Sequence, residues 1–429
     1  MKRTRLSPKF WAVLTVFSLV GQIAWVVENM YFNVFIYKMF HASAGAISTM
    51  VAASAVAATL TTIFIGALSD KLGKRKLFMC GGYILWGISI WSSALIRTDV
   101  ISKLFPAAVS AASAGVSLVI VMDCVMTFFG SSANDACFNA WLTDSTDETN
   151  RGAAEGVNAM MPLLAILVVF GGFMGFDLDQ ASSWVTIYMV IGITVLGIGV
   201  LGFFLIQEPD VDSSANQNIL RNVIYGFRPS VVRKNPALYL TLAAFAVFGI
   251  SIQIFMPYLI LYYEVILGME NYVLIMAPAI ILAAVVTFFY GKLYDKLHFR
   301  GTLLPALGML FGGYVLLWLT RSTMPVFLGS LLMMSGYLSG MAVFGAMVRD
   351  HTPSNRAGMF QGLRIVGQVL IPGVIGPWIG AWVLRNAETV VGSDGTLSFI
   401  PHAGIFLAAL AAGVLVLLPA LPLLREKAQ

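Results

Sequence analysis

The chain has 429 residues, of which 59% are hydrophobic and only 11% charged, and its formal net charge is +5. Soluble domains carry about 25% charged residues, so these few charges cannot cover a soluble surface. The composition excludes a disordered chain, a coiled coil and a disulfide scaffold, and it leaves a polytopic α-helical membrane protein. Basic residues are not interleaved with aromatics as on a nucleic-acid surface, so we expect no nucleic-acid partner.

Apolar runs separated by charged breaks predict twelve membrane spans, because about 20 apolar residues are needed to cross a bilayer. The first run is expected to be a span rather than a cleaved signal peptide, since it is too long and lacks a small-residue cleavage site. The fourth is too long for one simple crossing, so either its outer part, 107–118, projects beyond the bilayer or the helix is broken. The spans are expected near residues 10–37, 44–69, 77–96, 107–142, 156–175, 184–206, 238–263, 272–294, 301–320, 324–347, 360–384 and 401–424.

Basic residues fall on one side of these predicted spans. If both termini share a side, that side collects 20 Lys and Arg residues, the opposite side collects 5, and Arg364 is left inside a span. Basic loops face the cytoplasm in membrane proteins. We therefore expect a multi-pass protein of the cytoplasmic membrane with both termini in the cytoplasm.

The longest polar stretch divides the chain in the middle. Residues 207–237 carry mixed charge, Pro and Asn, and predict a cytoplasmic linker between two bundles at 1–206 and 238–429. Part of this linker, 219–227, either forms an amphipathic helix or is a solvated connector.

Two motifs recur in the same order in both halves. Gly-x-x-x-Asp-Lys-Leu begins at Gly66 and again at Gly291, an offset of 225 residues. After the fourth and the tenth spans, an aspartate is followed by an arginine and, twelve residues after the aspartate, by a glycine; the aspartates are Asp144 and Asp350. Such duplication is common among secondary transporters.

The first motif resembles the loop signature of the major facilitator superfamily, with Gly66, Asp70, Gly73, Arg75 and Lys76 at the matching positions. In the second copy His298 replaces a glycine. This resemblance covers essentially the whole chain. It implies an all-α fold of two pseudo-symmetric six-helix bundles, and transport by alternating access.

Acidic and basic residues at matched loop positions are candidate gating groups. Ion pairs between neighbouring helix ends could close the cytoplasmic side and break when the halves rock. The alternative is that the bases only follow the orientation rule, which does not explain the matched aspartates. The candidates are Asp70, Arg75, Asp144, Arg151, Asp295, Arg300, Asp350 and Arg356.

Polar side chains inside spans are costly in hydrocarbon and are therefore candidates for function. Glu28 and Asp135 are the expected proton-coupling residues, and Asp135 lies about 13.5 Å from Asp144 along a helix, near mid-membrane. The alternative is that one of them is a permanent partner of Arg364. Asp123 is expected nearer the outside, where it could simply be hydrated. The candidate substrate contacts are Trp25, Glu28, Asn29, Asp135, Asn139, Asn158, Gln253, Tyr258, Gln361, Arg364 and Gln368.

The sequence Asp135-Ala-Cys-Phe is similar to an aspartate motif of the glycoside–pentoside–hexuronide:cation symporters, the melibiose-permease-like branch. In that branch the aspartate contacts sugar, but here Cys137 replaces a proline. The branch also carries acids in the second span for sodium, and none occurs between Ala44 and Ser69. This departure favours a proton over sodium as the coupling ion.

These observations predict a monomeric proton-coupled transporter of a small polar solute, a sugar or glycoside. The alternative is a proton-driven exporter of drugs or metabolites with the same fold. A membrane enzyme is disfavoured, because the four histidines lie far apart and no phosphate-binding loop occurs. The three cysteines show no paired spacing, so neither metal nor cofactor is expected.

Overall fold

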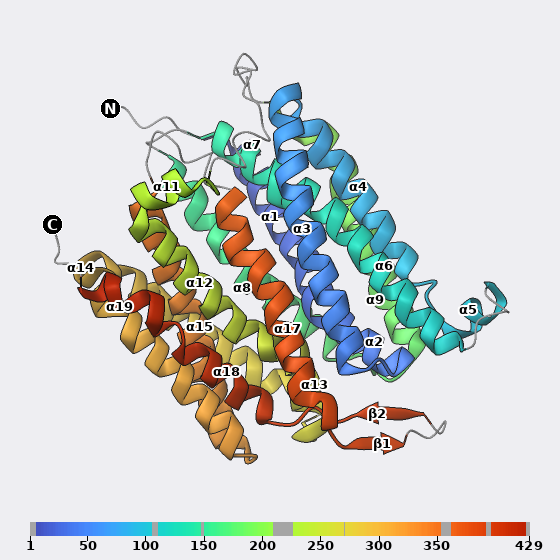
Figure 1. Ribbon diagram of the computed structural model, residues 1–429. Coiled ribbons are helices and arrows are strands. Elements are labelled where there is room, and N and C mark those ends of the chain that lie inside the picture. Colours follow the sequence, from blue (N-terminus) through green and yellow to red (C-terminus); the bar gives the residue numbers. More distant parts are fainter. Residues whose placement is uncertain are drawn as a thin grey trace. The chain divides into compact units, whose positions relative to one another are not determined.

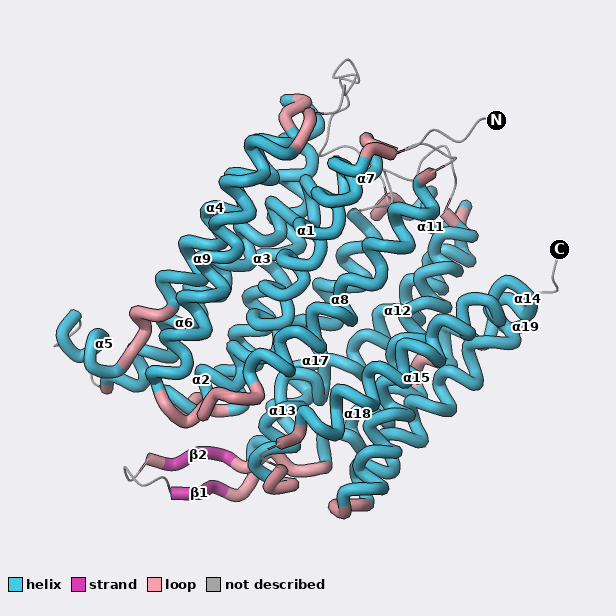
Figure 2. The backbone as a smooth tube through the Cα atoms, turned by 180° about the vertical axis from the view of Figure 1, so that it is seen from behind, coloured by secondary structure: helices cyan, strands magenta, loops and turns pink. Residues whose placement is uncertain are grey.

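The computed structural model describes residues 6–104, 110–146, 150–208, 226–269, 271–352, 362–391 and 396–425. The side chains of Asp70, Arg151, Gly152 and Asp295 lie outside this description. The described chain is helical apart from its turns, loops and one hairpin (Figure 2). Helices satisfy every backbone hydrogen bond within their own segment, which is what a hydrocarbon environment demands.

Contacts between residues divide the chain into two units. Unit 1 comprises residues 1–42 and 56–217, and unit 2 comprises residues 43–55 and 218–429. The first part of one helix, Ala44–Leu72, therefore clusters with unit 2, although it lies in the predicted N-terminal half. Most of the predicted linker lies outside the described residues, including 219–225 of the segment 219–227 that was expected to be either an amphipathic helix or a solvated connector.

Unit 1 is built from long helices, two of which contain wider π-helical turns (Figure 1). Ser7 caps the first helix by accepting a hydrogen bond from the Phe10 N–H at 3.1 Å. Helix α1 packs against α8 and α9, and α4 packs against α6 and α9. The elements are α1 Pro8–Val26, η1 Val27–Tyr31, α2 Phe32–Phe40, α3 Ala44–Leu72, α4 Arg75–Ser93, α5 Thr98–Leu104, α6 Ala111–Gly130, η2 Ser131–Phe138, α7 Asn139–Asp144, α8 Arg151–Phe173 and α9 Ala181–Leu205.

Unit 2 has its own core around α12, which packs against α15, α17, α18 and α19. Its two-stranded antiparallel hairpin pairs Thr389 with Phe399. The elements are α11 Pro229–Lys234, α12 Pro236–Phe255, η3 Met256–Tyr258, α13 Leu259–Leu261, η4 Tyr262–Ile266, α14 Val273–Leu319, α15 Thr323–His351, η6 Val366–Leu370, α17 Ile371–Val383, η7 Leu384–Asn386, β1 Thr389–Val391, β2 Leu397–Phe399, α18 Gly404–Val414 and α19 Leu417–Arg425.

Eleven helical segments of the described chain are long and apolar enough to cross a membrane, or twelve if the pair α4 and α5, bent by 94°, counts as one span. The predicted spans and these segments agree to within a few residues at most ends. The long fourth run is a continuous helical path from Ala111 to Asp144 that passes through η2. Residues 105–109, which precede it, lie outside the described residues.

The repeated loop motif keeps its turn geometry in both halves. Gly73 has a φ of 62°, and His298, which occupies the equivalent position 225 residues later, has a φ of 53°. A residue with a Cβ atom rarely adopts this left-handed conformation. The second copy therefore retains the sharp turn between two spans of α14 although its glycine is lost.

Glycines allow helices to pack backbone against backbone in each unit. In unit 1, a Cβ atom on Gly87 of α4 would lie 2.7 Å from the Gly192 carbonyl oxygen of α9, and one on Gly192 would lie 2.6 Å from the Trp91 nitrogen. In unit 2, a Cβ atom on Gly336 of α15 would lie 2.6 Å from Leu310 Cα of α14. Small residues permit such close approach between membrane helices.

Candidate functional site: buried carboxylates and an ion pair

Glu28 is a buried carboxylate in the first membrane span, with 3% of its surface exposed. It lies in η1 and accepts hydrogen bonds from the Thr127 hydroxyl at 2.5 Å and from the Trp86 indole N–H at 3.4 Å. The Trp86 ring in turn packs against Trp25, with ring centroids 5.1 Å apart. Donors on α4 and α6 therefore orient this carboxylate, and Trp25 lies beside the donor ring rather than directly on Glu28.

Three of the four π-helical segments in the described chain carry a candidate residue from the sequence analysis. They are Glu28 in η1, Asp135 in η2 and Gln368 in η6; the fourth segment, η4, contains Glu264, which was not a candidate. A π-helical turn interrupts the regular hydrogen-bond pattern and occurs frequently at functional sites. This feature therefore marks three of the polar groups that were selected because they are costly in hydrocarbon.

Asp135 is half-buried and accepts a hydrogen bond from the Ser131 hydroxyl at 2.9 Å. Its main-chain oxygen accepts a second one from the Asn139 side-chain amide at 3.1 Å. Asp123, by contrast, is buried, with 3% of its surface exposed. This burial contradicts the possibility that Asp123 is simply hydrated.

Asp123 lies on the same helix face as Thr127, one turn away, because residues four apart in a helix are neighbours. Ser131 and Asp135 continue this spacing of four into η2. Unit 1 therefore brings two predicted coupling residues and a third carboxylate to one polar stripe along α6 and η2.

Other predicted contacts in unit 1 are local. Asn158 of α8 accepts a hydrogen bond from the Ser18 hydroxyl of α1 at 2.5 Å, which ties two spans together. The exposed Asn29 donates to the Trp25 carbonyl one turn earlier at 2.9 Å. This hydrogen bond ties the Asn29 side chain to its own helix and not to the neighbouring Glu28.

In unit 2, Arg364 donates to Gln368 at 3.1 Å, so the predicted polar stripe on the eleventh span is partly assembled. Gln361, the third member of that stripe, lies outside the described residues. Gln253 of α12 is half-buried and packs against Gly376 of α17, where a Cβ atom would collide with it.

Tyr258 is fully buried and is committed to a structural contact rather than open to a cavity. Its hydroxyl lies 3.0 Å from the Ser48 hydroxyl and 3.0 Å from the Ala44 carbonyl oxygen, and Ser48 also donates to the Pro377 carbonyl at 2.7 Å. The α12 helix is interrupted here by the 3-10 turn η3, which contains Pro257.

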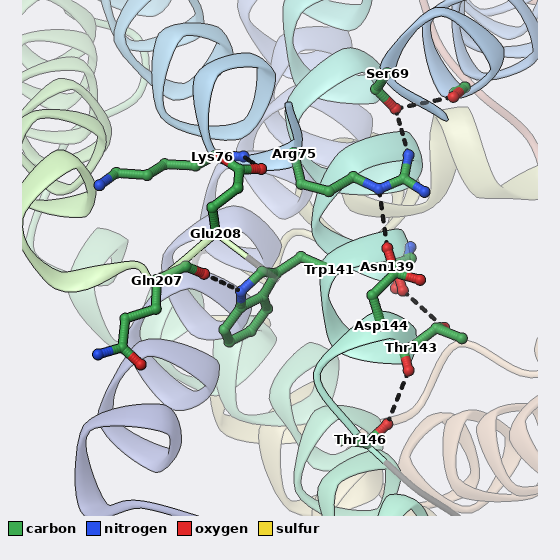
Figure 3. A network of polar contacts seen from close by, with 11 residues as sticks. Ser69, Arg75, Lys76, Asn139, Trp141, Thr143, Asp144, Thr146, Gln207 and Glu208 are labelled. Atoms are coloured by element: carbon green, nitrogen blue, oxygen red, sulfur yellow. Dashed lines mark hydrogen bonds and ion pairs between the residues drawn. The ribbon is translucent and has the colours of Figure 1, made fainter. Parts of the chain in front are cut away.

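An ion pair joins two predicted gating residues of unit 1. Arg75 Nε donates to Asp144 Oδ2 at 3.0 Å, and Arg75 Nη1 donates to the Ser69 hydroxyl at 2.7 Å. Figure 3 shows the Arg75 guanidinium held between these two groups. Only 5% of Arg75 is exposed, whereas Asp144 is exposed, so the pair joins a buried guanidinium to a carboxylate that water can reach.

Residues at the end of α9 extend this network (Figure 3). The Glu208 carboxylate accepts a hydrogen bond from the Lys76 backbone N–H at 3.0 Å, and the Trp141 indole donates to the Gln207 carbonyl at 3.4 Å. Both contacts fix the chain that leaves the last helix of unit 1 against the repeated loop. Sequence reasoning had not identified Ser69, Trp141 or Glu208.

The second half does not repeat this arrangement. Asp350, which corresponds to Asp144, accepts a hydrogen bond from the Tyr294 hydroxyl at 2.7 Å. Tyr294 occupies the position equivalent to Ser69, 225 residues later, and Arg300, equivalent to Arg75, is exposed. The side chains of the other predicted gating residues, Asp70, Arg151, Asp295 and Arg356, lie outside the described part of the chain.

Breaking the Arg75–Asp144 pair should destabilise unit 1. We expect Asp144→Ala to lower stability by about 1–3 kcal/mol, because it removes the carboxylate from the buried Arg75 guanidinium. Arg75→Ala should cost less, about 1 kcal/mol, because Asp144 is exposed and water can replace its partner. The double variant should lose less than the sum of the two. Thermal unfolding of the purified protein in detergent measures all three. Tyr294→Phe is the matched control, since the exposed Tyr294–Asp350 bond should contribute below about 1 kcal/mol. Additive losses in the double variant would contradict a direct pair.

Spacing in the sequence could have revealed part of what was missed. Asp123, Thr127, Ser131 and Asp135 follow one another at intervals of four in an otherwise apolar run, which places them along one side of a helix. Trp86, on another span, offers no such signal. Its contact with Glu28 depends on how α4 packs beside α1 and α6.

Comparisons with known proteins agree with this architecture. The profile of the Major Facilitator Superfamily matches residues 11–377, whereas a search of curated proteins found no match. Three solved structures share the fold at identities too low to indicate more than the fold. The nucleoside transporter NupG has a TM-score of 0.70 at 12% identity, covering 97% of this chain and 99% of its own. The xylose transporter XylE from E. coli has a TM-score of 0.71 at 14% identity, covering 97% and 99%. A bacterial homologue of the human lysosomal transporter Spinster has a TM-score of 0.67 at 16% identity, covering 97% and 96%.

The profile match extends over most of the predicted spans and both copies of the repeated motif. Together with the helical units and their polar membrane residues, it establishes that the chain belongs to the Major Facilitator Superfamily, a family of membrane transporters.

Proposed function

We propose that this protein is a proton-coupled secondary transporter that moves a small polar solute, a sugar or glycoside, by alternating access. The observation that carries this proposal is Glu28, a carboxylate buried in the first span and oriented by Thr127 and Trp86. It has the chemistry to take up and release one proton.

The surroundings of Glu28 explain why a proton is the favoured coupling ion. Negative charge is costly inside a membrane protein, and the Glu28 carboxylate is buried within the first span. Sodium requires several oxygen ligands at fixed distances, whereas a single carboxylate can accept a proton. Asp135 is the second proposed coupling residue, with its carboxylate held by Ser131.

Polar side chains of both units support a polar solute. We propose that the predicted contact residues that are not used in a structural hydrogen bond bind the substrate. Among them are Arg364, which is charged, and Gln368, which carries an amide; both lie in the eleventh span. Amide and guanidinium groups donate several hydrogen bonds each, which suits a solute rich in hydroxyl groups. Similar structures include one described as a D-xylose-proton symporter, with a TM-score of 0.67 at 13% identity.

We further propose that the matched loop charges act as a cytoplasmic gate. Arg75 and Asp144 are already paired in unit 1, and such a pair can exchange partners when neighbouring helices move. The distribution of basic residues supports placing these loops and both termini in the cytoplasm, and the protein in the cytoplasmic membrane. One chain holds two six-span halves, so we propose that the monomer is the transporting unit.

Uptake by reconstituted protein tests this function. Proteoliposomes with an inward proton gradient are expected to accumulate one or more sugars from a labelled panel, including D-xylose, and a protonophore should abolish the accumulation. Empty liposomes are the control. If no sugar moves while the protein drives efflux of lipophilic cations, the sugar proposal is wrong and the exporter is favoured.

A further inference from the structure

We propose that unit 1 contains its own proton route from the outer end of its spans to Glu28, in which a small cavity delivers protons to Asp123. The proposal rests on the proposed function, because Glu28 is the end of the route. It assigns a role to Asp123, to Tyr188 and to the cavity beside it. The route lies within one unit and does not use the groups proposed to bind substrate in unit 2.

The cavity lies between helices α2, α4 and α9. Its volume is about 30 Å³, enough for one or two water molecules. Exposed residues line it at one end, among them Arg97, Thr98 and Ala181, whereas Ser93 and Tyr188 line it and are buried. Water can therefore reach inward from the exposed end as far as the two buried hydroxyl groups.

The Tyr188 hydroxyl indicates that this cavity has a function. Its hydroxyl is fully buried and, among the described residues, has no hydrogen-bond partner. Buried hydroxyl groups are nearly always hydrogen-bonded to protein or to ordered water. The cavity also reaches α6, because the Ser93 hydroxyl in its lining donates to Met126 Sδ at 3.6 Å. Met126 lies three residues after Asp123 and therefore on the same side of α6. In the proposed route, a water in the cavity satisfies Tyr188 and passes a proton to the buried Asp123 carboxylate.

From Asp123 the route continues along one face of α6. Thr127 lies one helical turn further, about 5.4 Å along the axis, and its hydroxyl donates to Glu28 at 2.5 Å. In the proposed transfer, the Thr127 hydroxyl gives its proton to Glu28 and accepts one from Asp123. The hydroxyl is unchanged, Glu28 gains one proton, and Asp123 becomes ionised until water in the cavity reprotonates it.

The other ionisable groups around the route do not replace these roles. Asp135 lies in η2, and Cys124 is the neighbour of Asp123 on its own helix. Two cations near the cavity are paired, because Lys38 lies 3.2 Å from Asp179 and Arg97 lies 2.9 Å from Asp99, and Lys103 of α5 is exposed. Asp123 is thus the carboxylate between the cavity and Glu28.

A pH jump on the full-length protein tests the route without a transported solute. Protein in lipid nanodiscs is shifted rapidly from alkaline to acidic buffer while infrared spectroscopy follows the protonated-carboxyl band. Wild type should show a component that is missing in Glu28→Gln. In Asp123→Asn the rate at which this Glu28 component appears should fall by at least about tenfold, as is typical when a proton-transfer group is removed. In Tyr188→Phe it should also be slowed.

The outcomes separate the route from the proposed function. Wild-type kinetics in Asp123→Asn overturn the route but leave Glu28 as the coupling residue. An unchanged band in Glu28→Gln overturns both, since Glu28 then takes up no proton. If Asp123→Asn does not fold, Asp123→Glu is measured in its place. Because its side chain is longer, the Glu28 component should appear more slowly than in wild type but faster than in a protein whose cavity is blocked.

Blocking the cavity gives a second test that keeps Asp123 intact. Ala181 lines the exposed end, so Ala181→Cys modified with a bulky thiol reagent, in a Cys124→Ala background, should slow the Glu28 component. Ser182→Cys is the matched control, because Ser182 is exposed and adjacent but does not line the cavity. Equal rates in the two modified variants would overturn the route.

Discussion

Replacing Glu28 by glutamine is expected to abolish proton-driven accumulation while solute exchange across the membrane persists. Glutamine has nearly the same shape and can still accept the hydrogen bond from Thr127, so the local packing should survive. It cannot bind or release a proton, and the coupling step loses its carrier. We expect the initial rate of accumulation to fall by about a hundredfold or more.

Proteoliposome assays with and without a proton gradient measure both activities. Asp135→Asn should also abolish accumulation, because the amide keeps the contact with Ser131 but not the titrating carboxyl. Thr127→Val is the control for packing around Glu28, and it should slow accumulation without abolishing it. Normal accumulation in Glu28→Gln would remove Glu28 from the mechanism, and the same result in Asp135→Asn would remove Asp135.

A leucine in place of Gly192 is expected to prevent stable folding of unit 1. A Cβ atom on Gly192 would lie 2.6 Å from the Trp91 nitrogen and 2.7 Å from Trp91 Cα, both of them backbone atoms of α4. Backbone cannot rotate away as a side chain does, so α4 and α9 must separate. Overpacking of this kind costs about 3 kcal/mol or more when neither helix can yield.

Gly197 on the same helix provides a matched control. Nothing lies within 4 Å of a Cβ atom at that position. Gly197→Leu should therefore be tolerated, or be slightly stabilising by up to about 1 kcal/mol, because glycine disfavours a helix. Fluorescence-detected size-exclusion chromatography of heated samples compares the two variants. Equal melting temperatures would show that α4 and α9 are not in the described contact.

The repeated loop motif shows how similar sequences can reach different contacts. Asp144 and Asp350 occupy equivalent positions, yet one is bound by Arg75 and the other by Tyr294. The residue before the motif aspartate decides the difference, since Ser69 is too short to reach the aspartate and instead supports Arg75. Duplication in the sequence therefore predicts the place of each gate but not its chemistry.

The sequence by itself determined the class, the membrane spans and the shortlist of polar groups. These properties depend on composition and on hydrophobic length, because a residue in hydrocarbon is constrained by its own polarity wherever its neighbours lie. Glu28, Asp135 and Arg364 could be found for that reason. So could the loops at Gly73 and His298, since their motif is local in the chain.

The tertiary structure alone decided which of these groups meet. Trp86 reaches Glu28 because α4 lies beside the first span, to which it is also tied by the bond from the Tyr83 hydroxyl to the Phe17 carbonyl. Asp123 is buried, although the sequence left open that it is hydrated. Tyr258, a predicted substrate contact, is bonded to Ser48 and Ala44. Contacts of this kind join residues 58 to 214 positions apart, and no local pattern of polarity encodes which helix faces will pack together.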